Sequence, residues 1–157
     1  MKITLLSVGK TEEKYLQSGI DIYLKRLKHY IKLEVVEIAE LKNTKGLSQE
    51  QQKTKEAELI LKKLIATDFV VLLDERGQEL SSIQFADLLN KRMLASTQNL
   101  DFIIGGPYGF DNSIYQRAND KLSLSKLTFS HQMVRLFFAE QVYRAFTILK
   151  NEPYHHE

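Results

Sequence analysis

Phe69-Val70-Val71-Leu72-Leu73 gives the strongest signal for a buried strand in this chain, and Asp74-Glu75-Arg76-Gly77 follows it directly. A short, uninterrupted apolar run bounded by charge and glycine is typical of a strand that is covered on both faces of a parallel sheet. We therefore predict a buried strand at residues 69–73 that ends in a turn at residues 74–77.

Three other segments have strand character. Residues 3–8 are a short β-rich run that predicts a buried strand, central in the sheet, and residues 100–104 predict another strand. Residues 33–38 alternate between apolar residues and glutamates, which predicts a strand nearer an edge. Each of these runs is followed by a segment with turn or helix signals, so the strands are expected to lie parallel.

Helix signals fall between and after the strands. Thr11, Ser48, Ser81 and Ser130 are candidate N-caps, the last of them for a helix at residues 132–149. Strands that alternate with helices indicate an α/β fold, in which a mostly parallel sheet is flanked by helices.

The composition indicates a single domain over residues 1–157, because 43% of the residues are hydrophobic and can build one core. A net charge of only +2 provides no basic arm for gripping nucleic acid, so any RNA contact must come from local patches. The lack of cysteine excludes disulfides, thiolate metal sites and cysteine nucleophiles. Without a leader-like start or a run of about 20 apolar residues, a cytoplasmic protein is expected.

A ligand site is expected where two of the predicted strands end, because ligands of open α/β sheets bind beyond the carboxyl ends of the strands. One strand ends at Leu73, and the other is followed by Gly105-Gly106-Pro107-Tyr108-Gly109. Glycines at this place supply positive φ angles and bare backbone groups that can read an adenine or a ribose. A purely structural turn is the alternative, since the segment matches neither phosphate-binding glycine motif.

Residues 121–130 alternate hydroxyl and apolar side chains and lead directly into the last helix. Such a loop can offer backbone groups together with the apolar sides of Leu124, Leu127 and Phe129 to a flat ring. His131, at the start of the helix, is interpreted as a structural residue.

Blocks along nearly the whole chain resemble one enzyme family. The blocks are residues 1–10, residues 73–77 with Leu80-Ser81-Ser82, Ile104-Gly105-Gly106, residues 122–129, residues 131–135 and residues 140–146, ahead of Tyr154-His155. In this order they resemble the SPOUT methyltransferases that modify a ring nitrogen, N3, of a pseudouridine in large-subunit (23S) ribosomal RNA, the RlmH family.

The resemblance implies a C-terminal trefoil knot, S-adenosylmethionine as the cofactor held in the knot loops, and a symmetric homodimer. It favours the assembled ribosome as the substrate. The cofactor-binding positions that it implies are Leu73, Gly105, Leu124, Ser125, Lys126, Leu127, Thr128 and Phe129. The chain departs from the family pattern at Pro107-Tyr108, where small polar residues are expected, and this departure affects the shape of the loop.

Methylation of a uracil-like ring nitrogen requires loss of its proton, so the site needs a proton acceptor and a cation for the developing charge, and no metal. We predict His155 as the acceptor because histidine titrates near neutral pH. Tyr154 would place the target base, and Arg144 or Arg135 would stabilise negative charge on a carbonyl oxygen. Structural alternatives stay open, since Arg144 can pair with Glu140 one helical turn away and residues near a terminus are often unstructured.

The apolar residues of the last helix surround more of its circumference than one core face can cover. A homodimer that covers the remainder is predicted, with burial inside the monomer as the alternative. Two other functions also remain open. The first is a noncatalytic RNA- or ribosome-binding module with the same fold, and the second is a nucleotide-binding α/β protein that acts on small molecules.

Overall fold

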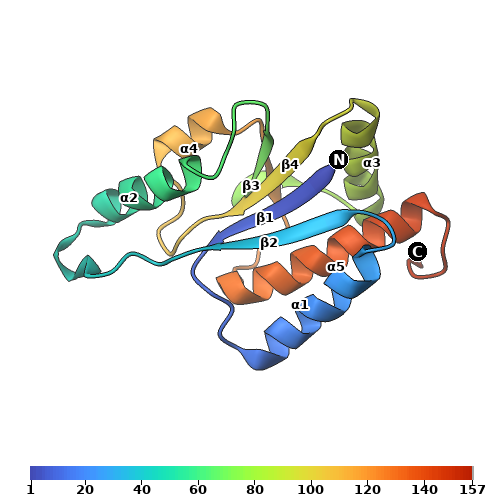
Figure 1. The fold of residues 1–157 in the computed structure, drawn as a ribbon, viewed down its shortest axis with the longest axis horizontal. Coiled ribbons are helices and arrows are strands. Elements are labelled where there is room, and N and C mark those ends of the chain that lie inside the picture. The colour runs from blue at the N-terminus through green and yellow to red at the C-terminus, as the bar shows by residue number, and fades with distance from the viewer. Residues whose placement is uncertain (157) are drawn as a thin grey trace.

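Five parallel strands form one sheet in the order β2-β1-β4-β3-β5 in the computed structural model, which describes residues 1–156 (Figure 1). The strands are β1 (Lys2–Val8), β2 (Lys32–Ile38), β3 (Phe69–Glu79), β4 (Asn99–Ile104) and β5 (Asp120–Ser123). The helices are α1 (Lys14–Leu27), α2 (Gln49–Leu61), α3 (Ser82–Leu94), α4 (Asn112–Arg117) and α5 (His131–Leu149), and a 3-10 turn spans Thr44–Gly46. The α/β prediction with a parallel sheet is confirmed.

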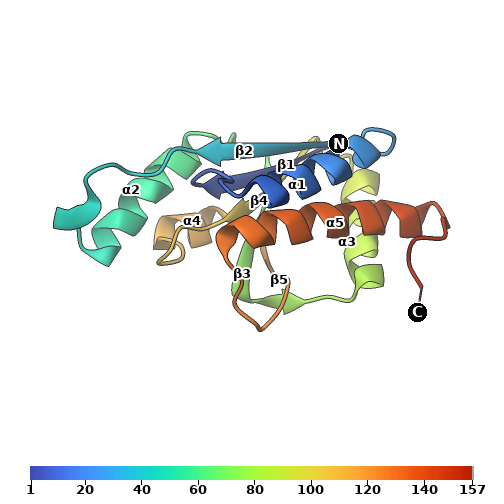
Figure 2. The same ribbon diagram turned by 90° about the horizontal axis from the view of Figure 1, so that it is seen from below.

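Helices cover both faces of the sheet. Alternate strand residues such as Leu5 and Phe102 join a core with α1, α3 and α5, whereas Leu6 and Ile103 join a core with α2 and α4. Helices α1 and α5 lie side by side, and residues 150–156 follow the end of α5 (Figure 2). None of the helices within residues 1–156 combines the length and the apolarity needed to cross a bilayer.

The predicted strands are confirmed, including the edge position of residues 33–38, but the turn predicted at residues 74–77 is wrong. Strand β3 continues to Glu79, because β5 pairs with both of its halves and the register shifts between Leu73 and Gln78. Gly77 makes this pairing possible. A Cβ atom at Gly77 would lie 2.6 Å from the backbone of Leu122.

Three of the four predicted N-caps are confirmed. Ser48, Ser81 and Ser130 each accept a hydrogen bond from the backbone N–H three residues later. Thr11 is the exception, since α1 begins at Lys14 after Glu13. The side-chain oxygen of Thr11 instead accepts a hydrogen bond from Arg135, which holds the segment before the helix in another conformation.

Asp101 on β4 is a buried carboxyl group within the sheet, with 5% of its surface exposed. Burial raises the pKa of Asp101 to about 6, the neighbouring Asp68 adds to the rise, and a hydrogen bond with Thr4 opposes it. A folded-state pKa above the unfolded value means that stability is present at low pH and is lost as the pH rises through about 6.

We therefore compare the free energy of unfolding of the variant Asp101→Asn with that of wild type at pH 4.5 and at pH 7.5. The difference, variant minus wild type, should be larger at pH 7.5 by roughly 1–3 kcal/mol, because only the wild type has to ionise a buried carboxyl group. Urea denaturation at several pH values measures this difference. The variant Asp87→Asn, at an exposed carboxyl group on α3, supplies the control for the change of side chain itself. A wild-type and Asp101→Asn difference that is the same at both pH values would contradict the expectation.

Candidate active site

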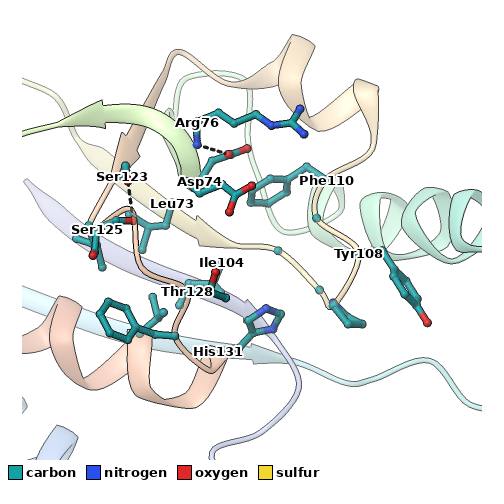
Figure 3. Close-up of a pocket in the computed structure, with 18 of the residues that line it drawn as sticks. Leu73, Asp74, Arg76, Ile104, Tyr108, Phe110, Ser123, Ser125, Thr128 and His131 are labelled. Atoms are coloured by element: carbon teal, nitrogen blue, oxygen red, sulfur yellow. Dashed lines mark hydrogen bonds between the residues drawn. The ribbon is translucent and has the colours of Figure 1, made fainter.

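A cavity of about 520 Å³ opens at the carboxyl ends of β4 and β5, beside the middle of β3 (Figure 3). Its walls are residues 73–76 of β3, residues 104–110 after β4, and the segment from Ser123 into the start of α5. Lys53 of α2 and Tyr115 of α4 complete the lining. We call this space the strand-end cavity. Its position is the one predicted from the carboxyl ends of the strands.

The structure brings together seven of the eight residues expected to bind the cofactor. The lining contains Leu73, Gly105, Leu124, Ser125, Leu127, Thr128 and Phe129. Lys126 belongs to the same loop and is not among the lining residues. The convergence in space is therefore observed, while the binding role of each residue stays a prediction.

Hydroxyl side chains hold the loop that follows β5. The Ser123 hydroxyl donates to the backbone carbonyl of Ser125 at 3.0 Å, and the Ser125 hydroxyl accepts from the backbone N–H of Leu127 at 3.0 Å. Leu127 is left 73% exposed. The ring of Phe129 packs on the ring of Phe137, with centroids 5.0 Å apart. The alternation of hydroxyl and apolar residues in the sequence thus reflects a loop that is held by its own side chains.

A polar wall of the cavity was missed from the sequence. The Tyr115 hydroxyl of α4 donates to Asp74 at 2.5 Å, and Asp74 also accepts from the backbone N–H of Arg76 at 2.8 Å. Burial raises the pKa of Tyr115 to about 12, and the hydrogen bond to Asp74 adds to the rise. Tyr115 therefore remains a neutral donor, and Asp74 presents a carboxylate acceptor to the cavity. No sequence signal joined these two residues, which lie 41 positions apart.

The glycine turn after β4 differs from its expected conformation. Of its three glycines, only Gly109 has a positive φ, at 80°. Gly105 and Gly106 serve close packing instead, since a Cβ atom at Gly105 would lie 3.2 Å from the ring of Phe110. The unusual Tyr108 is exposed and belongs to the cavity lining.

His131 also lines the strand-end cavity, although the sequence pointed to a structural residue. It is the first residue of α5. Burial lowers the pKa of His131, and the nearby positive charge of Arg135 lowers it further. A neutral imidazole at the cavity wall is the consequence.

Three of the four predicted catalytic residues meet at the other end of α5. Arg144 forms an ion pair with Glu140 at 2.6 Å and lies 3.3 Å from Nδ1 of His155, and the Tyr154 hydroxyl donates to Glu140 at 3.0 Å. We call these four residues the C-terminal cluster. The ion pair considered as a structural alternative is present, and it also holds the guanidinium group beside His155 and Tyr154.

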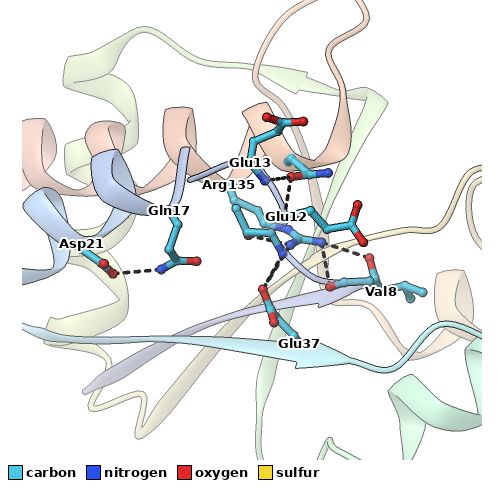
Figure 4. A network of polar contacts seen from close by, with 10 residues as sticks. Val8, Glu12, Glu13, Gln17, Asp21, Glu37 and Arg135 are labelled. Carbon is cyan, nitrogen blue, oxygen red and sulfur yellow. Dashed lines mark hydrogen bonds and ion pairs between the residues drawn. The ribbon is translucent and has the colours of Figure 1, made fainter. Parts of the chain in front are cut away.

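Arg135 does not join the C-terminal cluster. Its guanidinium group is 1% exposed and donates to the backbone carbonyls of Val8 and Gly9 and to the side chains of Thr11 and Glu37 (Figure 4). The carboxyl end of β1 is therefore fixed to α5 by this side chain. Of the two arginines considered for charge stabilisation, only Arg144 is placed beside the other predicted catalytic residues.

His131 and Val134 at the start of α5 line the strand-end cavity, whereas the C-terminal cluster lies near the other end of this helix, whose course Figure 1 shows. His131 and Arg144 are separated by about 20 Å along the helix axis. One chain therefore does not bring the predicted cofactor residues to the predicted catalytic residues. Within residues 1–156, no group of three or more histidine, aspartate or glutamate side chains is arranged to hold a metal ion.

The fold and the strand-end cavity define a parallel α/β protein with a cavity of small-molecule size between its strand-end loops. A family model described as "Predicted SPOUT methyltransferase" matches residues 1–155. The chain belongs to this family of SPOUT methyltransferases. The C-terminal trefoil knot that was expected is a feature that membership of the family implies.

Relatives covering almost the whole chain carry a more specific name. Proteins named ribosomal RNA large subunit methyltransferase H are 59% identical in Christiangramia forsetii, over 99% of both chains, and 57% identical in Flavobacterium psychrophilum, over 100% of both. A solved structure of a probable methylase family protein from Haemophilus influenzae Rd KW20 covers 99% of this chain and 70% of its own, with a TM-score of 0.50 and 13% identity. This last likeness concerns the fold alone.

Proposed function

We propose that this protein uses S-adenosylmethionine to methylate N3 of a pseudouridine in large-subunit ribosomal RNA, on the assembled ribosome in the cytoplasm. Family membership and the names of the relatives support methylation of ribosomal RNA. The choice of nucleotide rests on the resemblance described from the sequence. A net charge of +2 favours a preformed ribosomal surface as the source of recognition, because so small a charge gives weak binding to phosphates.

The residues of the strand-end cavity fit S-adenosylmethionine. A volume of about 520 Å³ suits a ligand of this size. Leu124, Leu127 and Phe129 offer apolar surface to a flat ring, and Asp74 offers a carboxylate to hydroxyl or ammonium groups. Bound S-adenosylmethionine would supply an electrophilic methyl group. Leu73 and Gly105 would form the floor against which the cofactor is oriented.

The C-terminal cluster supplies the groups that act on the target base. His155 would accept the ring proton, and Arg144 would stabilise the negative charge that develops on a carbonyl oxygen. Burial raises the pKa of Tyr154 well above its usual range, and hydrogen bonds with Tyr23 and Glu140 add to the rise. Tyr154 therefore stays protonated and can donate a hydrogen bond that places the base.

The second part of the proposal is that the protein acts as a homodimer. The observation that supports it is the separation of about 20 Å, along α5, between the strand-end cavity and the C-terminal cluster of one chain. In a symmetric dimer, the C-terminal cluster of one chain can reach the strand-end cavity of the other. One chain buries much of the apolar surface of α5, including Phe138 and Val142. It leaves Leu127 at 73% and Phe137 at 39% exposed beside the cavity, and these side chains suit an interface between subunits.

Two measurements test the function. Calorimetry should detect binding of S-adenosylmethionine to the purified protein, with loss of binding when Gly105→Val narrows the cavity. Mass mapping of ribosomal RNA from cells without the protein should reveal one unmethylated pseudouridine in the large subunit, restored by the wild-type gene. Binding of ribosomes without binding of S-adenosylmethionine would instead support the noncatalytic module.

A further inference from the structure

Glu56 is a buried acidic residue on the inner face of α2. Only 4% of its surface is exposed. Its Oε1 accepts a hydrogen bond from Gln52 at 3.1 Å, whereas Oε2 is buried without a hydrogen-bond partner among the described residues. A buried carboxyl group that lacks an ion pair is costly, so a role beyond packing is expected.

The unpartnered oxygen lies against the glycine turn after β4. A Cβ atom at Gly106 would be 2.2 Å from Oε2 of Glu56, which is far closer than atoms can approach. A side chain at Gly106 would therefore require either the turn or the Glu56 carboxyl group to shift, and the burial of Glu56 restricts where its carboxyl group can move. The Glu56 carboxyl group and the turn at Gly106 thus pack closely against each other.

The turn has the strand-end cavity on its other side. Gly105 and Gly106 line the cavity, while Glu56 is not among its lining residues. The carbonyl of Gly106 accepts a hydrogen bond from the backbone N–H of Gly109 at 3.1 Å, which closes the turn. Glu56 thus packs against the side of the Gly105-Gly106 turn that faces α2, whereas a molecule in the cavity would contact the opposite side of the turn.

The protonation of Glu56 is consistent with such a role. Burial raises the pKa of its carboxyl group, the hydrogen bond from Gln52 opposes this, and the nearby Glu40 adds to the rise. A carboxyl group that becomes neutral more readily is less costly to bury. Lys53, on the same helix, does not neutralise it, because Lys53 pairs with Glu50 at 2.6 Å.

We propose that Glu56 is a positioning residue, whose buried carboxyl group fixes the Gly105-Gly106 turn in the shape that binds the cofactor. The proposal deepens the proposed function and rests on it in one respect, namely that the strand-end cavity binds S-adenosylmethionine. Glu56 acts through the turn and does not touch the cofactor itself.

The first test compares the affinity for S-adenosylmethionine of wild type, Glu56→Ala, Glu56→Gln and Glu58→Ala by calorimetry. Glu56→Ala leaves a space behind the turn, so a loss of affinity of about tenfold is expected. Glu56→Gln has nearly the same volume and should stay within about threefold of wild type. Glu58 is an exposed residue of the same helix, and Glu58→Ala should bind like wild type.

Steady-state kinetics separate positioning from general damage to the fold. Glu56→Ala should raise the KM for S-adenosylmethionine about tenfold with a kcat close to wild type at saturation, because the catalytic residues are untouched. An unchanged KM would overturn the proposal, and so would an equal fall of kcat in Glu56→Ala and Glu56→Gln. If Glu56→Ala does not fold, the comparison of Gly106→Ala with Glu56→Asn/Gly106→Ala tests the proposal instead.

The second test uses the contact with Gly106. Gly106→Ala should weaken the binding of S-adenosylmethionine by at least about tenfold, because the added methyl group collides with Glu56. In Glu56→Asn/Gly106→Ala the shorter side chain makes room, so the loss should be smaller than in Gly106→Ala alone. Equal losses in these two proteins would overturn the proposal. Failure of wild type to bind S-adenosylmethionine would overturn the proposed function as well, whereas the other outcomes leave that function intact.

Discussion

Replacing Arg144 with alanine is expected to lower the rate of methyl transfer by about 10²- to 10³-fold, as the loss of a group that stabilises transition-state charge commonly does. The guanidinium group lies beside His155 and Tyr154, where the proposed reaction develops negative charge on the target base. Affinity for S-adenosylmethionine should stay close to wild type, because Arg144 is proposed to act on the target base and is not among the residues that line the strand-end cavity. Transfer of labelled methyl groups to ribosomes from cells without the protein measures the rate, and calorimetry measures the affinity.

Two matched variants separate catalysis from the structural role of the ion pair. Glu140→Gln removes the negative charge that pairs with Arg144 and keeps a side chain of nearly the same shape as Glu140. Its rate of methyl transfer therefore reports the effect of losing the ion pair alone. Arg144→Lys keeps the positive charge without the planar fork and should recover only part of the activity. If Glu140→Gln matches Arg144→Ala in rate, or if Arg144→Ala keeps its full rate, then Arg144 has no catalytic role of its own.

The short strand β5 falls partly in a segment interpreted as a loop, but the other four strands could be read from the sequence, because β1, β3 and β4 contain short apolar runs and β2 alternates apolar residues with glutamates. The extension of β3 beyond Leu73 could not, because Asp74-Glu75-Arg76-Gly77 has the composition of a turn. Pairing with β5 overrides that local preference, and β5 itself has only four residues. The short helix α4 escaped prediction for a related reason, since six residues show too little periodicity.

The candidate site was predicted unevenly. Residues of the loop after β5 that the resemblance named, apart from Lys126, do lie at the cavity, and their binding role stays a prediction. Asp74 and Tyr115 were missed because their hydrogen bond joins distant parts of the chain. Arg135, in contrast, was named as a candidate for charge stabilisation but lies away from the C-terminal cluster. Its charge suggested a role at the reaction centre, but its burial against the backbone carbonyls of Val8 and Gly9 depends on packing that no local pattern reveals.

Two inactive chains are expected to form an active heterodimer when their defects lie in different parts of the site. Gly105→Val narrows the strand-end cavity, and Arg144→Ala removes the charge-stabilising group. If each site combines the cavity of one chain with the C-terminal cluster of the other, a heterodimer of these chains contains one intact site of two. About half of the wild-type methylation rate per dimer should then appear, from subunits that are each inactive as homodimers. Coexpression with two different tags and tandem purification provides the heterodimer.

The decisive control places both substitutions in one chain and pairs this chain with a wild-type partner. Each of the two shared sites then carries one defect, because the doubly substituted chain damages one site through its cavity and the other through its C-terminal cluster. This heterodimer should be nearly inactive, although half of its chains are wild type. A site built within a single chain predicts the reverse pattern, with about half of the rate in the control and none in the complementing pair. Such a reversal, or a monomeric mass for the active enzyme in solution, would contradict the proposal that each active site combines the cavity of one chain with the C-terminal cluster of the other.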